Sequence, residues 1–139
     1  MSKSLLITVA FALAASAGAC RHGDAVTVPH TVAEDLSGTW AESYQIPGAS
    51  TIITLAAADS SISGTGTYAI EAGQPGTIAV TGVISADKTV DLDLTRSDGW
   101  IGHFRGAFAS RDSLSGYIWF RSSFAIGDPA PASFHRITP

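Results

Sequence analysis

The chain has 139 residues, 45% of them hydrophobic, and a formal net charge of −4 at pH 7. The acidic balance argues against nucleic acid as a partner, because nucleic-acid binding needs clustered lysine and arginine. A single cysteine excludes a disulfide within the chain. The length suits one domain with its own hydrophobic core.

Residues 1–19 have the composition of a signal peptide. Lys3 supplies a positive charge, residues 5–15 are an unbroken apolar run, and residues 16–19 are small. The apolar run would form a helix of about 16 Å, too short for a hydrocarbon core of about 30 Å. This length disfavours the alternative of a membrane-spanning helix. Removal of Lys3 with the signal leaves seven basic and twelve acidic residues, a formal charge of −5.

Cys20 follows the small residues Ala17, Gly18 and Ala19. This arrangement resembles the bacterial lipobox, whose cysteine is acylated and becomes the mature N-terminus, although the lipobox prefers leucine where Ala17 stands. The resemblance implies lipidation of Cys20, and thus a membrane anchor in the bacterial cell envelope. Arg21 rather than aspartate comes next, which resembles lipoproteins sorted to the outer membrane, where the domain would face the periplasm. The alternative is an ordinary secretory signal followed by an incidental cysteine.

The sequence divides after residue 35. Residues 20–35 contain few large apolar side chains and are predicted to form the lipid anchor and a flexible tether, with residues 36–139 as the folded domain. In that domain, short runs rich in β-branched and aromatic residues alternate with polar turns, and no stretch of useful length has a helical period. Seven breaks separate eight runs at spacings of about 8 to 13 residues, which predicts eight strands. The breaks are residues 46–48, 58–60, 73–76, 86–88, 97–99, 111–113 and 127–131.

A glycine returns inside these predicted strands, in LSGTW, ISGTGTY, VTGVI, FRGAF and LSGYIW. The glycines are Gly38, Gly64, Gly82, Gly106 and Gly116. Glycine normally weakens a strand, so its return favours a small closed barrel whose strands bend sharply. A general bias toward glycine and serine is the alternative. The predicted fold is an all-β, eight-stranded, antiparallel up-and-down barrel.

Gly38, Trp40 and Arg136 carry a resemblance to a known superfamily. Gly38-Thr39-Trp40 in the first predicted strand and Arg136 in the last are similar to the calycins, which include lipocalins, fatty-acid-binding proteins and avidins, over about residues 36–138. The resemblance implies that Trp40 closes the barrel base and that Arg136 packs over its ring. A cation–π contact of this kind is worth about 0.5 to 2 kcal/mol.

Within that superfamily, the order of strand motifs is most similar to avidins and streptavidins. Tyr68 and Trp119 match biotin-binding positions, whereas Glu42, Ile70 and Ala132 stand where that family has asparagine, serine and aspartate. A buried ureido group would be left unpaired, at about 1 to 3 kcal/mol per group. We therefore expect biotin to bind weakly or not at all.

Strand alternation predicts which side chains face the interior. If Trp40 points inward, the predicted ligand-lining residues are Glu42, Tyr44, Tyr68, Ile70, Trp100, Phe104 and Trp119. This set suits a small, largely apolar ligand whose polar end is oriented by Glu42, without a cofactor. The alternative is that the aromatic side chains simply fill the barrel.

The seventh predicted strand is apolar on both faces. Tyr117 and Trp119 share one face, and Leu114, Ile118 and Phe120 share the other, which is predicted to be the outer one. Two apolar faces indicate that something covers the outside of the strand. A second copy of the chain, a partner protein and the loop that follows the strand are the candidates.

The sequence gives little support for catalysis or a metal site. Two histidines fall in the predicted tether, and neither His103 nor His135 has a zinc-like spacing to other ligands. Asp91 and Asp93 are interpreted as a solvated strand face, and no nucleophile motif or phosphate loop is present. We therefore do not expect an enzyme. Two functions stay open: a barrel that binds a small apolar ligand inside, and a barrel with a filled interior that binds protein as an envelope inhibitor or assembly factor.

Overall fold

The structure is a computed structural model that describes residues 31–43, 48–70, 73 and 75–138. The predictions for the signal peptide, for Cys20, for tether residues 21–30 and for Tyr44 lie outside the described residues. The described part contains a short helix, α1 (Val32–Leu36), followed by eight strands. The strands are β1 (Gly38–Glu42), β2 (Ser50–Ala58), β3 (Ser61–Ala69), β4 (Gly76–Ile84), β5 (Val90–Arg96), β6 (Ile101–Ser110), β7 (Ser113–Arg121) and β8 (Ala130–Thr138).

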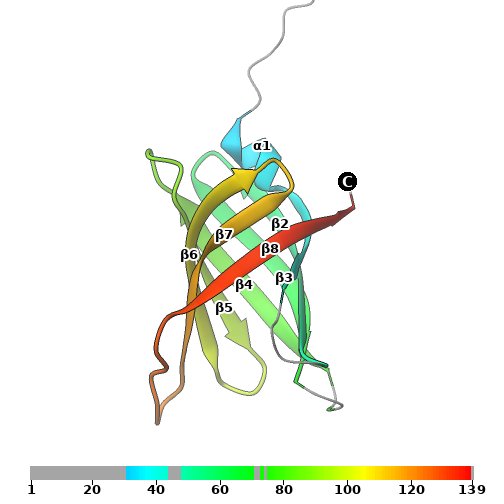
Figure 1. The fold of residues 1–139 in the computed structure, drawn as a ribbon, viewed down its shortest axis with the longest axis vertical. Helices are drawn as coiled ribbons and strands as arrows, with labels where there is room; N and C mark the ends of the chain where they lie inside the picture. Colours follow the sequence, from blue (N-terminus) through cyan, green and yellow to red (C-terminus); the bar gives the residue numbers. More distant parts are fainter. Residues whose placement is uncertain (1–30, 44–47, 71–72, 74, 139) are drawn as a thin grey trace, which may run out of the picture.

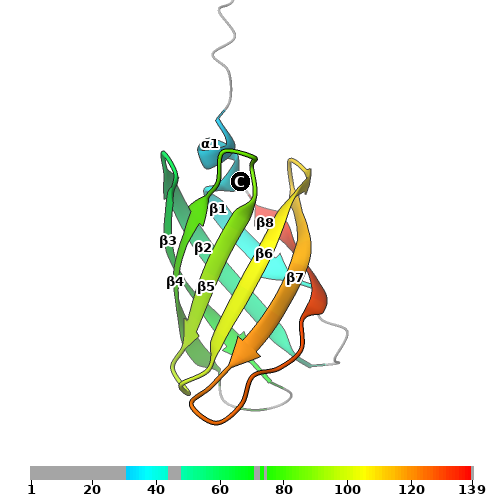
Figure 2. The ribbon, with the colours of Figure 1, turned by 90° about the vertical axis from the view of Figure 1, so that its left-hand side faces the viewer.

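The eight strands form a closed antiparallel barrel (Figures 1 and 2). Each strand pairs with its neighbours in sequence, and β8 pairs with β1 to close the sheet. The predicted fold class is therefore confirmed. Each of the seven predicted breaks overlaps a strand connection, and none extends more than two residues into a strand.

Side chains alternate between the inside and the outside of the barrel along each strand. In β5, Val90, Leu92 and Leu94 are buried, while Asp91 and Asp93 between them face outward, as predicted. Strand β2 alternates in the same way, with Ile53 and Leu55 buried. The period of two in the sequence thus separates a solvated surface from an apolar core.

The barrel has two different ends. We call the end that carries α1 the α1 end; the connections β2–β3, β4–β5 and β6–β7 also lie there (Figure 2). We call the opposite end the far end; it carries the connections β1–β2, β3–β4, β5–β6 and β7–β8. This arrangement follows from the up-and-down topology, because successive connections alternate between the ends.

Helix α1 corrects the predicted boundary between tether and domain. Ala33 and Leu36 are buried, and the indole Nε1 of Trp40 donates a hydrogen bond of 2.8 Å to the carbonyl oxygen of Leu36. The described residues of the predicted tether from Val32 onward therefore belong to the folded domain. Five residues make less than two helical turns, so the sequence shows no helical period here.

The barrel interior near α1 is filled by side chains. The largest fully buried ones are Trp40, Phe104, Phe134, Leu36, Ile53, Leu92, Leu114, Val80 and Val90. The rings of Phe104 and Phe134 meet edge to face with centroids 5.1 Å apart, and Phe108 contacts Trp40 in the same way at 6.1 Å. These contacts form one continuous core.

Strand β7 overturns a prediction about its faces. Leu114 and Ile118 are buried in the core and Phe120 packs against it, whereas Tyr117 is 58% exposed on the outside. The predicted outer patch of Leu114, Ile118 and Phe120 is therefore an inner face. Alternation alone could not decide between two apolar faces, because the assignment rested on placing Trp119 inside.

Candidate binding site at the far end of the barrel

The α1 end is held together by Arg136. Its guanidinium carbon lies 4.4 Å from the ring centroid of Trp40, which is 0% exposed, and this confirms the contact implied by the calycin resemblance. Arg136 also donates to the carbonyl oxygens of Ser37, at 2.7 Å, and of Asp35. Because these carbonyls flank the end of α1, Arg136 ties the helix to β8.

Gly38 makes room for this arginine. It has a φ of +138°, and a Cβ at this position would lie 2.4 Å from Nη1 of Arg136. Only glycine combines that backbone angle with that close approach. The predicted structural role of Gly38, Trp40 and Arg136 at the base of the barrel agrees with this geometry.

At the far end, β5 places an arginine inside the barrel. Arg96 follows Leu92 and Leu94 on the inner face, and its side chain is only 10% exposed. The guanidinium carbon lies 3.8 Å from the ring centroid of Tyr68 and 5.9 Å from that of Phe120. Arg96 therefore lies between two aromatic side chains from opposite sides of β5, one on β3 and one on β7.

Asp98 holds the guanidinium of Arg96 from the β5–β6 connection. Nε donates to Oδ1 at 3.2 Å and Nη2 to Oδ2 at 2.5 Å, which is a two-bond pairing. Burial would raise the pKa of Asp98, but hydrogen bonds from Arg96, from the backbone N–H of Trp100 and from Tyr68 outweigh it and hold the pKa below its ordinary value. Asp98 is thus ionised at neutral pH and neutralises the arginine.

Tyr68 is held in place by a glycine on the next strand. Gly76 pairs with Tyr68 in the β3–β4 register, and a Cβ on Gly76 would lie 2.3 Å from the tyrosine ring. The ring therefore lies flat over the backbone of β4. On its other neighbour, β2, Tyr68 pairs with Thr51, which is buried.

Glu42 adds a carboxylate to this end of the interior. It lies two residues after Trp40 on the same face of β1, is half-buried, and its Oε2 has no contact with solvent. In register it pairs with Phe134 of β8. Glu42, Thr51, Tyr68 and Arg96 thus put polar groups on the inner faces of four strands at the far end.

The structure brings some of the predicted lining residues inside the barrel. Glu42 and Tyr68 lie on the inner face at the far end. Phe104 also points inward, as predicted, but it is 1% exposed and enclosed by the core, so it is a packing residue. Only the first two are placed to meet a ligand at the far end.

The other predicted lining residues lie elsewhere. Trp119 points outward and stacks on His103, with ring centroids 5.5 Å apart, so its assignment to the interior is wrong. Ile70 lies just beyond the end of β3 and is 53% exposed, because the strand stops before it. Trp100 is half-buried in the β5–β6 connection, with its backbone N–H bonded to Asp98. Tyr44 lies outside the described residues.

Arg96, Asp98 and Phe120 belong to the far end but were not predicted to line it. Continuing the alternation of VDLDLTR by one step puts Arg96 on the face of Leu94, so this signal was present in the sequence. Phe120 required the correct choice between the two apolar faces of β7. Asp98 is a turn residue, and only the structure shows that its carboxylate pairs with Arg96.

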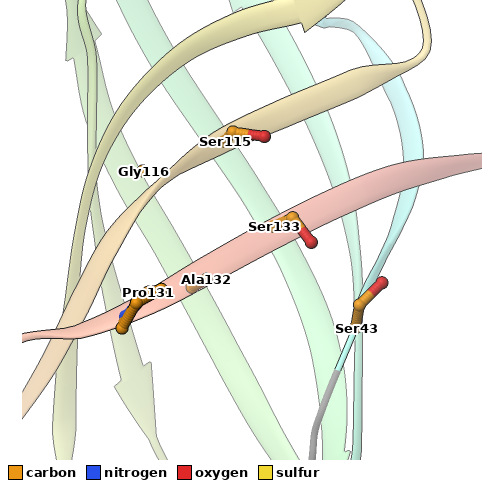
Figure 3. A pocket seen from close by; sticks show the side chains of 6 residues that line it. All are labelled: Ser43, Ser115, Gly116, Pro131, Ala132 and Ser133. Carbon is orange, nitrogen blue, oxygen red and sulfur yellow. The ribbon is translucent and has the colours of Figure 1, made fainter.

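Two shallow hollows lie outside this site. One, of about 270 Å³, lies on the outer surface of β7 and β8 beside the end of β1 (Figure 3). It is lined by Ser43, Ser115, Gly116, Pro131, Ala132 and Ser133. The other, of about 190 Å³, lies at the β2–β3 hairpin. These two hollows contain none of the predicted lining residues.

No protein-family model matches the chain, and no curated protein matches it either. The closed eight-stranded barrel is compatible with a calycin-like fold. In the part of the chain that the structure describes, no helix is both long and apolar enough to span a membrane. Within the same residues, no three His, Cys, Asp or Glu side chains are grouped as metal ligands would be.

Proposed function

We propose that the protein is a bacterial envelope lipoprotein, anchored through an acylated Cys20, whose barrel binds a small, largely apolar ligand at its far end. The observation that carries the proposal is Arg96, a nearly buried cation on the inner face of an apolar barrel. A buried ion pair is often no more stabilising than apolar residues of similar volume. Polar groups that converge beside aromatic rings are, in contrast, typical of ligand sites.

The packing limits where such a ligand can bind. Trp40, Leu36 and Val90 occupy the α1 end, so a ligand does not reach the base of the barrel. At the far end, the ring of Phe120 offers aromatic surface for the apolar part of the ligand, since the Tyr68 ring is covered by Arg96 and by the backbone at Gly76. Glu42 and Arg96 offer charges for its polar end. The ligand therefore enters from the far end and stays near it.

The test is a calorimetric titration with three amphiphiles that share an octyl chain: octanoate, octylamine and octanol. We expect at least one to bind with a Kd below about 1 mM, which corresponds to roughly 4 kcal/mol. Glu42→Gln and Arg96→Gln should change that affinity. Asp59→Asn is the control, because it makes the same change of charge as Glu42→Gln in the β2–β3 turn at the α1 end. Failure of all three amphiphiles to bind, or wild-type affinity in both far-end variants, would contradict the proposal.

A second candidate function is protein binding. Phe124 and Ile126, in the β7–β8 connection at the far end, are 97% and 81% exposed. The connection is structured: Ser122 Oγ accepts hydrogen bonds from the backbone N–H groups of Phe124 and Ala125, both at 3.2 Å. It therefore holds two apolar side chains in solvent, as a protein-binding loop would. This location replaces the one predicted on β7.

Site-specific photo-crosslinking would favour the second function. A partner captured from position 124, but not from the exposed outer position of Val83, would support it if the three amphiphiles also fail to bind. Equal capture at both positions would count against a specific protein site.

A further inference from the structure

The outer surface of three neighbouring strands carries an ordered set of side chains that the far end does not use. Two rows cross β5, β6 and β7, and each row runs from a carboxylate through a basic side chain to an aromatic ring. We call this set the outer grid. Its rows are Asp93, His103 and Trp119, and Asp91, Arg105 and Tyr117.

The first row is held by two close contacts. His103 Nδ1 lies 2.5 Å from Asp93 Oδ1, and the imidazole ring stacks on the indole of Trp119 with 22° between the ring planes. A carboxylate can only accept, so Nδ1 carries the proton, and in the neutral ring Nε2 is then an acceptor. The row therefore combines a fixed imidazole with a partly exposed indole.

The second row is more exposed. Arg105 Nε lies 3.6 Å from Asp91 Oδ1, and Arg105 pairs in register with Tyr117, which is 58% exposed. The side chain of Arg105 is itself 64% exposed. The two rows together leave aromatic surface beside hydrogen-bonding groups on one open face.

This combination fits the chemistry of a sugar. A pyranose ring has an apolar face of C–H groups and a rim of hydroxyls. The C–H face packs on an aromatic ring, and the planar carboxylate and guanidinium groups can each bond two adjacent hydroxyls. Tyr117 is the exposed ring of the grid, and Arg105 is its neighbour across the strands. Asp91 lies one strand further along the same row and Asp93 lies in the other row, and all three charged side chains are partly exposed.

We propose that the outer grid is a second binding site, separate from the far end, and that it takes a pyranose of a neutral glycan. The charges favour a neutral ligand, because Asp93 is paired with His103 and Asp91 with Arg105. A strongly charged glycan would have to break one of these pairs. Sugar binding would then explain why Tyr117 and Trp119 lie on the outside of β7, without a loop or a second subunit that covers them.

The experiment is a calorimetric titration with cellotriose, maltotriose and triacetylchitotriose. We expect at least one to bind with a Kd below about 5 mM. Tyr117→Ala should weaken that binding by about tenfold or more, since it removes the exposed ring. Asp93→Ala should also weaken it, since it removes the acceptor that orients His103. Circular dichroism checks that each variant is folded.

Phe124→Ala is the matched control, because it removes an exposed aromatic ring outside the grid. It should bind the trisaccharide as the wild type does. The proposal is overturned if none of the three sugars binds at about 10 mM, a concentration that would detect even weak sites. It is also overturned if Tyr117→Ala binds like the wild type, or if Tyr117→Ala and Phe124→Ala lose affinity equally.

Discussion

Each end of the barrel places an arginine over an aromatic ring, but the two arginines have different partners. At the α1 end, Arg136 lies 4.4 Å from Trp40 and is bonded to the backbone carbonyls of Ser37 and Asp35. Its Nε also donates to Asp112 Oδ1 at 3.1 Å. At the far end, Arg96 lies 3.8 Å from Tyr68 and is bonded to the side chain of Asp98. Both arginines also pair with a partly exposed carboxylate, so what sets Arg136 apart is its two bonds to backbone carbonyls.

The bonds from Arg136 to backbone carbonyls are structural contacts, whereas the bond from Arg96 to the Asp98 side chain is one that a ligand would exchange under the proposed function. A backbone carbonyl beside α1 cannot leave Arg136 unless the helix detaches. The carboxylate of Asp98 is 38% exposed, and under the proposed function a ligand would replace it on Arg96 without unfolding the chain. The α1 end therefore contributes mainly stability, and the far end is where binding is expected.

The largest effect is expected at the α1 end, from Trp40→Ala. This change removes a fully buried ring together with its bond to Leu36, and should cost about 3 to 5 kcal/mol of unfolding free energy. Urea denaturation followed by circular dichroism measures it. A loss below about 1 kcal/mol would mean that Trp40 does not hold the base of the barrel.

Arg136→Gln should have the next largest effect. It leaves two backbone carbonyls without their charged donor and uncovers the Trp40 ring. Hydrogen bonds from charged groups contribute about 1.5 to 3 kcal/mol, so a loss of about 2 to 3 kcal/mol is expected in the same denaturation experiment. If the variant is as stable as the wild type, α1 is not held by this arginine.

Arg96→Gln should cost less, about 1 kcal/mol, because its main contributions are one cation–π contact and one side-chain pair with a partly exposed carboxylate. The informative quantity is the difference from Arg136→Gln, measured side by side. A larger loss for Arg96→Gln than for Arg136→Gln would reverse the assignment of the two ends.

The contribution of Asp98 to the unfolding free energy should depend on pH. Its pKa is lowered in the folded state, so the ionised carboxylate favours folding at pH values above its unfolded pKa of about 3.9. This contribution is lost as the pH falls through the lowered pKa. Asp98→Asn should therefore lose less stability than the wild type between pH 5 and pH 2, as measured by urea denaturation at each pH. Parallel curves for the two proteins would show that Asp98 is not held in this way.

The smallest effect on stability is expected from Phe124→Ser. Its side chain is 97% exposed, so the unfolding free energy should change by less than about 0.5 kcal/mol. A clear loss of stability would show that the loop packs on the barrel, and would remove the observation that favours protein binding.

The sequence was sufficient for the strands and for the base of the barrel. Turn residues every 8 to 13 positions located the connections, and alternation in β5 assigned its faces, because acidic residues separate the buried ones. The contact of Trp40 with Arg136 followed from the calycin resemblance. Helix α1 was missed because one short turn has no period and is stabilised by the tertiary contacts of Leu36 and Ala33.

The site was harder to predict than the fold. β7 is apolar on both faces, so periodicity could not tell whether Trp119 or Phe120 points inward; the stacking of Trp119 on His103 across the strand decides it. The role of Asp98 depends on which side chain lies opposite a turn, which local sequence does not encode. Strand alternation alone would have placed Arg96 on the inner face. That placement was not predicted because charged side chains are expected to lie outside.

The three tryptophans report on three places: Trp40 at the base, Trp100 beside Asp98 at the far end, and Trp119 on the outer grid. The most direct test of the central claim is therefore a ¹H–¹⁵N correlation spectrum of their three indole N–H signals during a titration with octanoate, octylamine or octanol. With the amphiphile that binds, the signal of Trp100 should shift while that of Trp40, bonded to Leu36, stays in place. A shift of Trp40 without one of Trp100, or no shift with any of the three, would contradict binding at the far end.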